Sequence, residues 1–391
     1  MHEEQRLTVI VSLVESYDFK KPLVLFLRNH FRAHRNMGSR DRRIVTQSVY
    51  SYFRLGKALS SLTSPEKIAI GLFLCSETAD EFTTWCISQN SKLKPEGISV
   101  SLKEKADIVK TVYPAFSLEE IFTFQKHVSS EIDFEEFAAS LLNKPGVFIR
   151  TRKRFHRAVL KELSEKNITH KEVEETNAVE IISSSRLEDL ESFQKGYFEV
   201  QDLSSQQTGN YFEPLQESYW WDACAGSGGK SLMLHEKENS VRILATDVRE
   251  KSLLNLKERF SRAGFKNYRI RIVDLENSAL NTNEMFDGII ADVPCSGSGT
   301  WARSPEQLSS FDEKLIAQYS EKQKNIVKNI LRNLPASSPL IYITCSVFAA
   351  ENEENLKYFS ENFGLKTESS RYIKGYEKGA DSLFVAKLTT K

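Results

Sequence analysis

From about residue 201 onwards, short apolar runs alternate with amphipathic stretches. The apolar runs predict strands at 218–224, 241–247, 268–274, 286–292, 339–345 and 382–389. The stretches between them predict helices, among them 229–236, 250–263 and 312–334. Such alternation is typical of a doubly wound parallel sheet covered by helices on both faces. We therefore expect an α/β domain over residues 197–391.

The chain ahead of this domain has two different textures. Residues 1–140 show helical periodicity, clearest from Asp41 to about Leu59, with Ser39 before it as a possible N-cap. The apolar stripe of this segment consists of Ile44, Val45, Ser48, Val49, Tyr52 and Phe53. Residues 141–196 combine short strands near 147–150 and 179–182 with an amphipathic helix over 155–166. We expect an all-helical domain over 1–140 and a small α+β subdomain over 141–196.

Charge is balanced over the whole chain but not along it. The 391 residues include 53 Lys or Arg and 53 Asp or Glu. Residues 1–60 nevertheless hold 11 basic against 5 acidic residues, and residues 141–170 hold 8 against 2. A single basic segment is equally well explained as a solvated helix face. Two such segments ahead of one α/β domain favour a polyanionic partner such as RNA.

The five cysteines show no paired short spacing, which is typical of a reducing compartment. None forms a Cys-x-x-Cys pair matched by a second pair or by histidines, so we expect no metal site. No apolar run reaches membrane-spanning length, and the start does not read as a signal peptide. These features predict a cytoplasmic location without a membrane partner.

A glycine-rich loop follows the first predicted strand of the α/β domain. Its residues are Cys224, Ala225, Gly226, Ser227, Gly228, Gly229 and Lys230. Glycines let the backbone approach a ligand and leave helix N-terminal amides available to it. The end of the loop also matches a Walker A phosphate loop, whose first glycine would fall at Cys224. In that reading Asp292 stands for the metal-holding acid of an ATPase.

Acidic residues close the next strands. Asp247 comes 17 residues after Lys230, where a nucleoside-binding fold has the acid that grips ribose hydroxyls. Asp274 and Asp292 end the third and fourth predicted strands. Each acid alone is more often a helix cap or a solvated turn residue. The ordered series favours a nucleoside ligand without a bound phosphate, such as S-adenosylmethionine.

Two cysteines also stand just past predicted strands. Cys295 follows Gly288–Asp292, and Cys345 follows Leu340–Ile343. A free cysteine is usually a small core residue. At the carboxyl end of a parallel strand, however, a thiol points into the crevice where open α/β sheets bind ligands.

These motifs resemble the Sun/RsmB-like RNA (cytosine-5) methyltransferases. The resemblance is carried by Asp222–Lys230, by Asp292-Val293-Pro294-Cys295-Ser296-Gly297, by Tyr342-Ile343-Thr344-Cys345-Ser346 with Glu351-Asn352, and by Val200–Gln206. It is strong over 197–391 and fair over 144–196, where family members carry a small RNA-binding subdomain. Residues 37–43 with Tyr50 and Arg54 resemble the NusB-like helical domain of the 16S rRNA members. The resemblance implies a Rossmann-like methyltransferase domain whose cofactor is S-adenosylmethionine.

The resemblance also implies a role for each site residue. Cys345 attacks carbon 6 of the cytosine, and Cys295 takes part in releasing the product. Asp292 binds N3 and the exocyclic amine, and Lys230 adds positive charge. The cofactor would lie against residues 224–230, Asp247, Asp274 and Asp292. The expected RNA contacts, from the basic segments and from the family's Arg-x-Pro-Glu, are Arg40, Arg42, Arg43, Arg150, Arg152, Arg154 and Arg303.

The chain departs from the family pattern in two places. Gly226-Ser227 replaces the usual Ala-Pro, which we expect to loosen the loop, and Ala302 stands where an arginine is frequent. Ribosomal RNA is the favoured substrate. The same chemistry on tRNA, a P-loop-like ATPase and a non-catalytic RNA-binding assembly factor remain alternatives.

Overall fold

The computed structural model describes residues 1–183 and 186–390. Contacts group them into two units, each described by itself. The helical unit comprises residues 1–128, 133–144 and 300–313. The sheet unit comprises residues 129–132 and 145–299 and the chain from residue 314 onwards. Residues 300–313 therefore belong with the helices, although they follow a strand of the sheet in sequence. The domain boundaries after residues 140 and 196 stay predictions.

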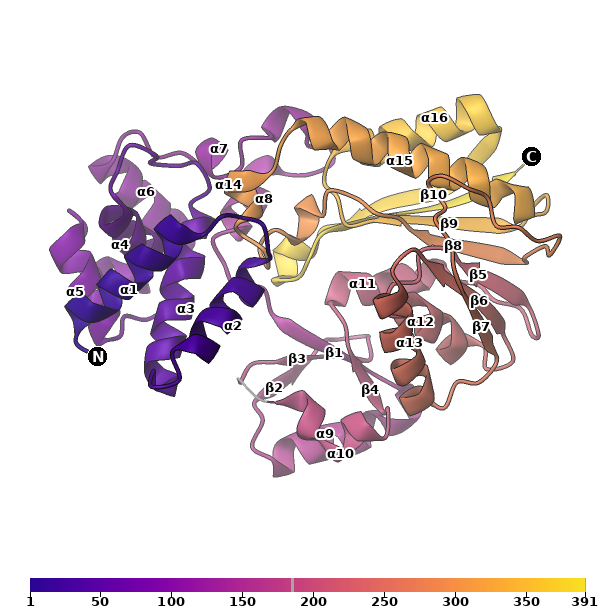
Figure 1. Cartoon of the computed structure of the whole chain (residues 1–391), viewed down its shortest axis with the longest axis horizontal. Helices are drawn as coiled ribbons and strands as arrows, with labels where there is room; N and C mark the ends of the chain where they lie inside the picture. Colours follow the sequence, from indigo (N-terminus) through magenta and orange to yellow (C-terminus); the bar gives the residue numbers. More distant parts are fainter. Residues whose placement is uncertain (184–185, 391) are drawn as a thin grey trace. The chain divides into compact units, whose positions relative to one another are not determined.

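The helical unit contains nine described α-helices. They are α1 (Glu3–Ser16), α2 (Leu23–Ala33), α3 (Ser39–Arg54), α4 (Ser64–Cys75), α5 (Glu81–Asn90), α6 (Leu102–Val112), α7 (Leu118–Ile121), α8 (Phe134–Ser140) and α14 (Gln307–Ser310) (Figure 1). Thr63 and Ser101 form capping boxes that start α4 and α6. The core of this unit joins α1 to α5 through residues such as Ile10, Val45 and Phe82.

Helix α3 carries the apolar stripe that its periodicity predicts. Ile44, Val45, Ser48, Val49 and Phe53 are buried, and Tyr52 packs against the same core. The expectation of an N-cap at Ser39 was wrong. Gly38 is the cap residue and makes no side-chain bond, so Ser39 is the first residue of the helix. Gly38 has no side-chain oxygen that could cap the helix. A search for a capping hydroxyl therefore pointed to Ser39, one residue later.

The first part of the sheet unit is a four-stranded antiparallel sheet in the order β2-β3-β1-β4. Its elements are β1 (Val147–Thr151), α9 (His156–Glu165), β2 (His170–Glu172), β3 (Ala178–Ile181), α10 (Glu191–Gln194) and β4 (Phe198–Val200). The inner face of α9 packs on this sheet through Val159 and Leu163.

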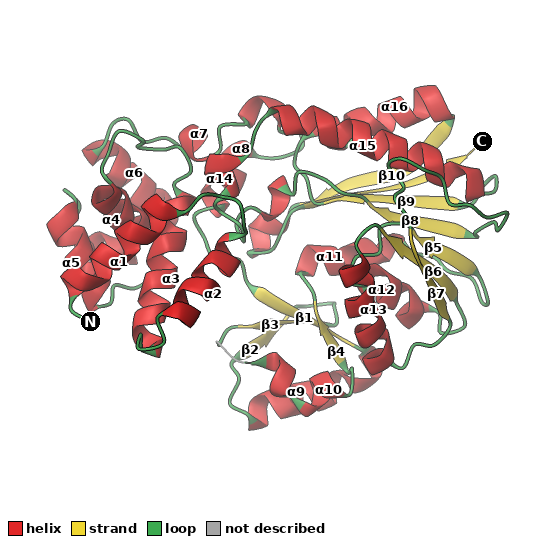
Figure 2. Ribbon diagram, viewed as in Figure 1, coloured by secondary structure: helices red, strands yellow, loops and turns green. Residues whose placement is uncertain are grey.

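The rest of the sheet unit is a seven-stranded sheet in the order β10-β11-β9-β8-β5-β6-β7. Its elements are α11 (Leu203–Gln207), β5 (Tyr219–Asp222), α12 (Gly229–Lys237), β6 (Arg242–Asp247), α13 (Glu250–Ala263), β7 (Tyr268–Ile272), β8 (Gly288–Asp292), α15 (Lys314–Ile330), β9 (Pro339–Thr344), α16 (Glu353–Phe363), β10 (Leu365–Ile373) and β11 (Leu383–Thr390). Helices α12 and α13 cover one face and α15 and α16 the other (Figure 2). This is the Rossmann-like layering that the alternating pattern predicts.

The sheet differs from the prediction in two strands. Strand β11 runs antiparallel between β9 and β10, so only β7, β6, β5, β8 and β9 form the parallel part. Strand β10 was not anticipated. Six of its consecutive residues, 366–371, are exposed, so no alternation of apolar and polar residues marks it as a strand.

The order of the parallel strands decides where a ligand can bind. Strand β5 is central, with β6 on one side and β8 on the other. The chain therefore leaves the carboxyl ends of β5 and β8 in opposite directions. In open α/β sheets this switch point forms the ligand crevice.

Candidate active site

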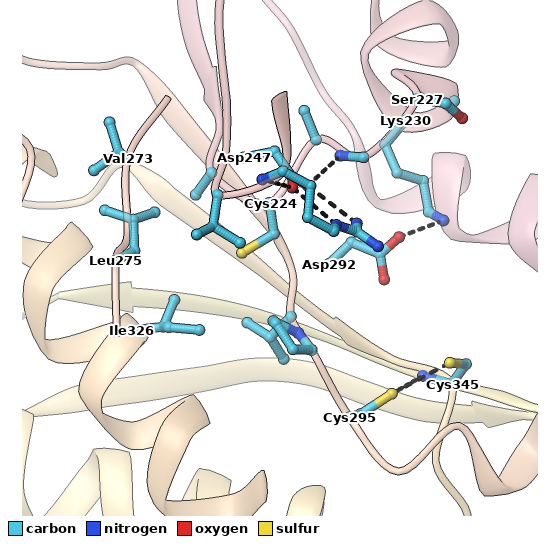
Figure 3. Close-up of a pocket in the computed structure, with 18 of the residues that line it drawn as sticks. Cys224, Ser227, Lys230, Asp247, Val273, Leu275, Asp292, Cys295, Ile326 and Cys345 are labelled. Atoms are coloured by element: carbon cyan, nitrogen blue, oxygen red, sulfur yellow. Dashed lines mark hydrogen bonds and ion pairs between the residues drawn. The ribbon is translucent and has the colours of Figure 1, made fainter. Parts of the chain in front are cut away.

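A cavity of about 760 Å³ opens at the carboxyl ends of the parallel strands. Figure 3 shows side chains from several strand ends around it. The predicted site residues that line it are Cys224, Ala225, Gly226, Ser227, Gly229, Lys230, Asp247, Asp274, Asp292, Cys295 and Cys345. Cys345 is partly exposed there rather than sealed in the core.

Gly228 is the one predicted loop residue that does not line the cavity. It has a φ of +81° and begins α12 in the left-handed conformation. A Cβ at this position would lie 2.5 Å from Cε1 of Phe260 and 2.9 Å from Cγ of Leu256. Glycine is therefore required here for close packing on α13 and for the turn, which is a role behind the cavity wall.

Ser227 does not loosen the loop, contrary to the expectation from its departure from Ala-Pro. The Arg259 guanidinium donates to the Ser227 carbonyl at 3.0 Å and to its hydroxyl at 2.7 Å. Arg259 is itself held by the buried Glu199, with Nε donating at 2.9 Å. A neighbouring helix thus supplies the restraint that a proline would supply through its ring.

Asp247 ends β6 with both carboxylate oxygens engaged. Its Oδ2 accepts from the Gly226 amide at 2.9 Å, which joins the glycine loop to the next strand. Arg249 donates to the same carboxylate from its backbone and its guanidinium. These hydrogen bonds keep the pKa of Asp247 below its ordinary value despite the opposing effect of burial. The Arg249 side chain is 68% exposed, so exchanging it for a ligand hydroxyl costs about 1 kcal/mol or less.

An apolar wall lies beside the acids. Val273, Leu275 and Ile326 face the cavity (Figure 3). Val248, next to Asp247, also lines it and is 57% exposed. Asp274 stands on the loop after β7 and accepts from the Glu276 amide and the Asn277 side chain. Apolar surfaces flanked by carboxylates match a flat ring with polar edges, as adenosine has.

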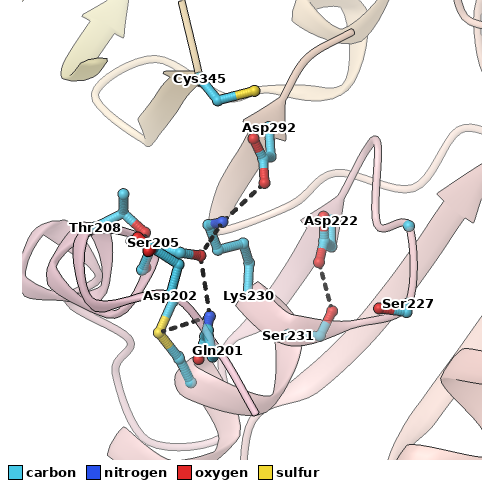
Figure 4. A network of polar contacts seen from close by, with 12 residues as sticks. Gln201, Asp202, Ser205, Thr208, Asp222, Ser227, Lys230, Ser231, Asp292 and Cys345 are labelled. Carbon is cyan, nitrogen blue, oxygen red and sulfur yellow. Dashed lines mark hydrogen bonds and ion pairs between the residues drawn. The ribbon is translucent and has the colours of Figure 1, made fainter. Parts of the chain in front are cut away.

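Asp292 and Lys230 form an ion pair in the same cavity as Cys295 and Cys345. Lys230 Nζ donates to Asp292 Oδ2 at 2.8 Å and to Ser205 Oγ at 2.9 Å (Figure 4). The Lys230 side chain is 10% exposed, whereas that of Asp292 is 32% exposed and keeps a face towards the cavity. Gln201 donates to Ser205 at 3.2 Å, so the segment before β5 helps to hold the lysine.

Asp222 lies beneath this pair and is fully buried. Its Oδ2 accepts from Ser231 Oγ at 2.7 Å, while Oδ1 has no partner. Burial raises the pKa of Asp222 to about 7, and the nearby Asp292 carboxylate adds to the rise. The motif comparison included this residue but gave no sign that its carboxyl would be desolvated.

The two site cysteines are in contact. Their Sγ atoms lie 3.2 Å apart, and the Cys345 amide donates to Cys295 Sγ at 3.3 Å (Figure 3). Both are free thiols. The hydrogen bond to Cys345, together with burial, raises the pKa of Cys295 well above its ordinary value. Cys295 therefore holds its proton at neutral pH and can donate it as a hydrogen bond to the neighbouring sulfur.

Glu351 joins the loops that carry the cysteines. Its Oε2 accepts from the Ser296 amide at 2.9 Å and from Gln323 Nε2 at 2.9 Å. Its Oε1 accepts from Ser346 Oγ at 2.6 Å. The side chain is fully buried, and burial raises the pKa of its carboxyl. Sequence reasoning missed this function, although Glu351 was part of the third motif.

The predicted RNA-binding arginines of the helical unit lie at or near its surface. Arg40 and Arg43 are exposed, and Arg40 pairs with Glu81 at 3.3 Å. Arg42 lines a groove of about 620 Å³ between α2 and α3. The other basic residues of this groove are Arg28, Arg32 and Arg35, with Phe31 and Tyr50 beside them. Arg303 is half-buried in the 300–313 segment.

The predicted arginines of the sheet unit divide into two kinds. Arg154 is exposed and lies over the Phe155 ring, 4.5 Å from its centroid. Arg150 and Arg152 are buried, contrary to the expectation of surface residues, and both approach Glu236. Arg150 lies on strand β1 and Arg152 directly follows it, and the local sequence did not reveal that both side chains point inwards.

Within residues 1–183 and 186–390, no three His, Cys, Asp or Glu side chains come together as a metal-binding group. In the same part of the chain, no helix combines the length and the apolar character needed to cross a bilayer.

Comparison with known sequences finds a family model that matches part of this chain. Residues 210–388 match the family described as 16S rRNA methyltransferase RsmB/F. Ribosomal RNA small subunit methyltransferase B of Photorhabdus laumondii is 30% identical over 229 residues, which are 55% of this chain and 52% of that protein. The chain thus spans about half the length of this relative.

Comparison with solved structures identifies the same fold. The crystal structure of PH0851 covers 100% of this chain and 99% of its own, with a TM-score of 0.74 at 20% identity. NSun6 from Pyrococcus horikoshii, solved with SFG, covers 68% of this chain and 97% of its own, with a TM-score of 0.61 at 17% identity.

Proposed function

We propose that this chain, of which residues 210–388 match the family described as 16S rRNA methyltransferase RsmB/F, methylates carbon 5 of a cytosine in ribosomal RNA, with S-adenosylmethionine as the methyl donor. One observation carries the proposal. Cys345, Asp292 and Lys230 line the same cavity as the glycine loop and the acids Asp247 and Asp274. A thiol, an ion pair and a nucleoside-type site therefore share one crevice.

The cavity residues fit the cofactor. Asp247 would accept the ribose hydroxyls in exchange for Arg249, and the apolar wall with Val248 and Leu275 would enclose the adenine. The glycine loop has no side chains to obstruct the approach at Gly226 and Gly229. When bound, S-adenosylmethionine supplies an electrophilic methyl group.

Cys345 is the nucleophile in this proposal. Carbon 5 of cytosine is a poor nucleophile until sulfur adds to carbon 6, which turns the ring into an enamine. That addition requires a thiolate. The Cys295 thiol lies within hydrogen-bonding distance of the Cys345 sulfur and holds its own proton, so it can stabilise negative charge on Cys345.

Asp292 and Lys230 orient the base in this proposal. The exposed face of Asp292 would accept from the exocyclic amine of the cytosine, while Lys230 keeps the carboxylate in place. Polar groups fixed before the reaction stabilise charge that develops on the ring. A paired cytosine would have to leave its helix to reach them.

We further propose that the thiol of Cys295 acts in product release. The proton on carbon 5 must leave before the bond between Cys345 and carbon 6 can break. Cys295 would first release its own proton to solvent in the open cavity, and its thiolate would then take the proton from carbon 5, which restores the thiol as the bond between Cys345 and carbon 6 breaks.

The RNA contacts proposed here come from both units. In the helical unit they are Arg40, Arg42, Arg43 and Arg303, and the groove with Arg28, Arg32 and Arg35 extends them. In the sheet unit the proposal retains Arg154. It omits Arg150 and Arg152 as surface contacts because they are buried.

The ATPase alternative is disfavoured by the loop sequence, because Cys224 replaces the first glycine of a Walker A loop. A non-catalytic assembly factor would have no need for two thiols in contact at an open cavity.

Bisulfite mapping of total RNA from cells with and without the protein tests the proposal. We expect one or a few cytosines of the small-subunit rRNA to lose protection when the protein is absent. Loss of protection in tRNA alone would show that tRNA, rather than rRNA, is the substrate. Unchanged maps of both RNAs would refute the activity.

A further inference from the structure

A second cavity of about 520 Å³ lies in the sheet unit, away from the cysteines. Its walls come from residues 150–154, from Gln206–Asn210, from the carboxyl-terminal end of α12 and from the end of α13. Helix α12 contributes to both sites, because Gly229 and Lys230 line the first cavity whereas Met233, His235, Glu236 and Lys237 line the second.

The lining of this cavity is strongly basic. It contains Arg150, Arg152, Lys153, Arg154 and Lys237 against a single acid, Glu236. The positive charges of Arg152 and Arg154 add to the effect of burial in lowering the pKa of His235, which also lines the cavity. The remaining polar lining consists of neutral amides from Asn177, Gln206, Asn210 and Asn239.

Two of these arginines are more than nine-tenths buried and incompletely bonded. Arg150 donates to Gln201 Oε1 at 2.7 Å and to Glu236, yet its Nη2 has no partner. Arg152 donates from Nη1 to the Ala263 carbonyl at 2.8 Å, and its Nε lies 3.6 Å from Glu236 Oε1 in an ion pair, yet its Nη2 has no partner. Buried donors without acceptors are rare in proteins because each costs about 1–3 kcal/mol.

Charge around these arginines is also uncompensated. Arg259 and Arg262 occupy the other nearby carboxylate, Glu199, at 2.9 and 3.4 Å. Four guanidinium groups in this region therefore share two carboxylates. Water could accept the free N–H groups but would leave the excess charge unbalanced, whereas an oxyanion satisfies both.

We propose that this second cavity binds a phosphate group. Planar guanidinium groups bind phosphate through paired N–H donors, and Lys153 and Arg154 at the surface would attract it. The phosphate would come from the RNA backbone, in which case the inference rests on the proposed function, or from free phosphate.

The test compares matched variants of the full chain. Lys153→Ala removes one charge from the cavity, and Lys161→Ala removes one exposed charge from α9 outside it. Asn210→Asp adds a negative charge at the cavity without removing a buried arginine. Circular dichroism and thermal unfolding verify that each variant is folded.

Two probes distinguish the sources of phosphate, both without methyl transfer. The first is the affinity for a short single-stranded oligoribonucleotide at constant ionic strength. The second is the rise in melting temperature caused by sodium phosphate relative to sodium chloride. An RNA site predicts about a tenfold loss of oligoribonucleotide affinity in the cavity variants and a smaller salt dependence. A free-phosphate site predicts a melting shift in the wild type that the cavity variants lack, with RNA affinity unchanged.

Either result supports the inference. It is overturned if the cavity variants and the α9 control behave alike with both probes. The outcome is independent of the proposed function, because a failure of methylation would leave phosphate binding measurable and a failure of phosphate binding would leave methylation measurable.

Discussion

The two ends of helix α12 present different chemistry. At its start, carboxylates, thiols and basic side chains line a cavity in which Lys230, Asp292 and Asp247 all have partners. At its end, arginines line a cavity and several of their donors have none. The first arrangement suits a reaction, because its polar groups are fixed before a substrate arrives. The second suits an anion, because four guanidinium groups share two carboxylates and several N–H donors lack acceptors.

The largest effect is expected from Cys345→Ala. Removing the nucleophile should lower the methylation rate by roughly 10⁴-fold or more, since no other group here can activate carbon 5. RNA affinity and the phosphate-dependent melting shift should not change. The rate is measured as transfer of labelled methyl groups to rRNA fragments. Retained methylation would contradict the separation of roles between the two cavities.

Cys295→Ala tests the role of the second thiol in the first cavity, at the start of α12. If its thiol acts in product release, the variant should accumulate a protein–RNA adduct that survives a denaturing gel. The double variant Cys295→Ala/Cys345→Ala is the control and should give no adduct. Normal turnover by Cys295→Ala would reduce this residue to a hydrogen-bond donor.

Glu351 tests whether the cysteine loops need their shared carboxylate. Glu351→Ala leaves the Ser296 amide and Gln323 without their acceptor, and should lower the free energy of unfolding by about 3 kcal/mol. Glu351→Gln preserves most of the shape and should stay folded, with methylation lowered about tenfold by poorer alignment of the sulfurs. Unfolding curves and methylation rates separate these outcomes. Full activity of Glu351→Gln would confine Glu351 to a role in stability.

The buried carboxyl of Asp222, near the first cavity, should make the stability of the protein depend on pH. Its folded pKa of about 7 exceeds the ordinary value of 3.8, so the folded state holds a proton that the unfolded state releases between these pH values. Its contribution to stability is therefore present at low pH and lost as the pH rises to about 7. Asp222→Asn should gain stability relative to the wild type across this window, measured by urea unfolding. A difference that does not vary with pH would contradict the buried carboxyl.

Arg249→Ala should have the smallest effect. Its exposed ion pair with Asp247 competes with a ligand, so its removal should strengthen S-adenosylmethionine binding by up to about fivefold. Calorimetric titration measures this change, with Lys251→Ala as the control. A tenfold loss of affinity would show that Arg249 itself holds the cofactor.

The residues of the first cavity, at the start of α12, were largely predictable because local sequence patterns mark them. Apolar runs followed by Asp247, Asp292 or Cys345 mark strand ends, and the carboxyl ends of parallel strands meet at one edge. The function of Glu351 was not predictable, since it depends on how two distant loops approach each other. Strand β10 was missed because exposed edge residues need no apolar alternation.

The arginine-lined second cavity, at the end of α12, was poorly predictable because its geometry depends on contacts between distant segments. Arg150, Arg152 and Arg154 alternate along a basic segment, and nothing local shows which of them turn inwards. Only Arg150 and Arg152 are buried. Arg150 pairs with Glu236 on α12, and Arg152 donates to the Ala263 carbonyl at the end of α13. Composition identified a basic region correctly but could not separate surface charges from buried ones.

RNA carrying 5-azacytosine at the target position provides the most direct test of the bond between sulfur and pyrimidine. Nitrogen at ring position 5 leaves no proton to remove after methylation, so the enzyme should stay attached. Digestion and mass spectrometry then identify the modified peptide. The account predicts the nucleotide on Cys345. A nucleotide on Cys295, or methylated RNA without any adduct, would contradict it.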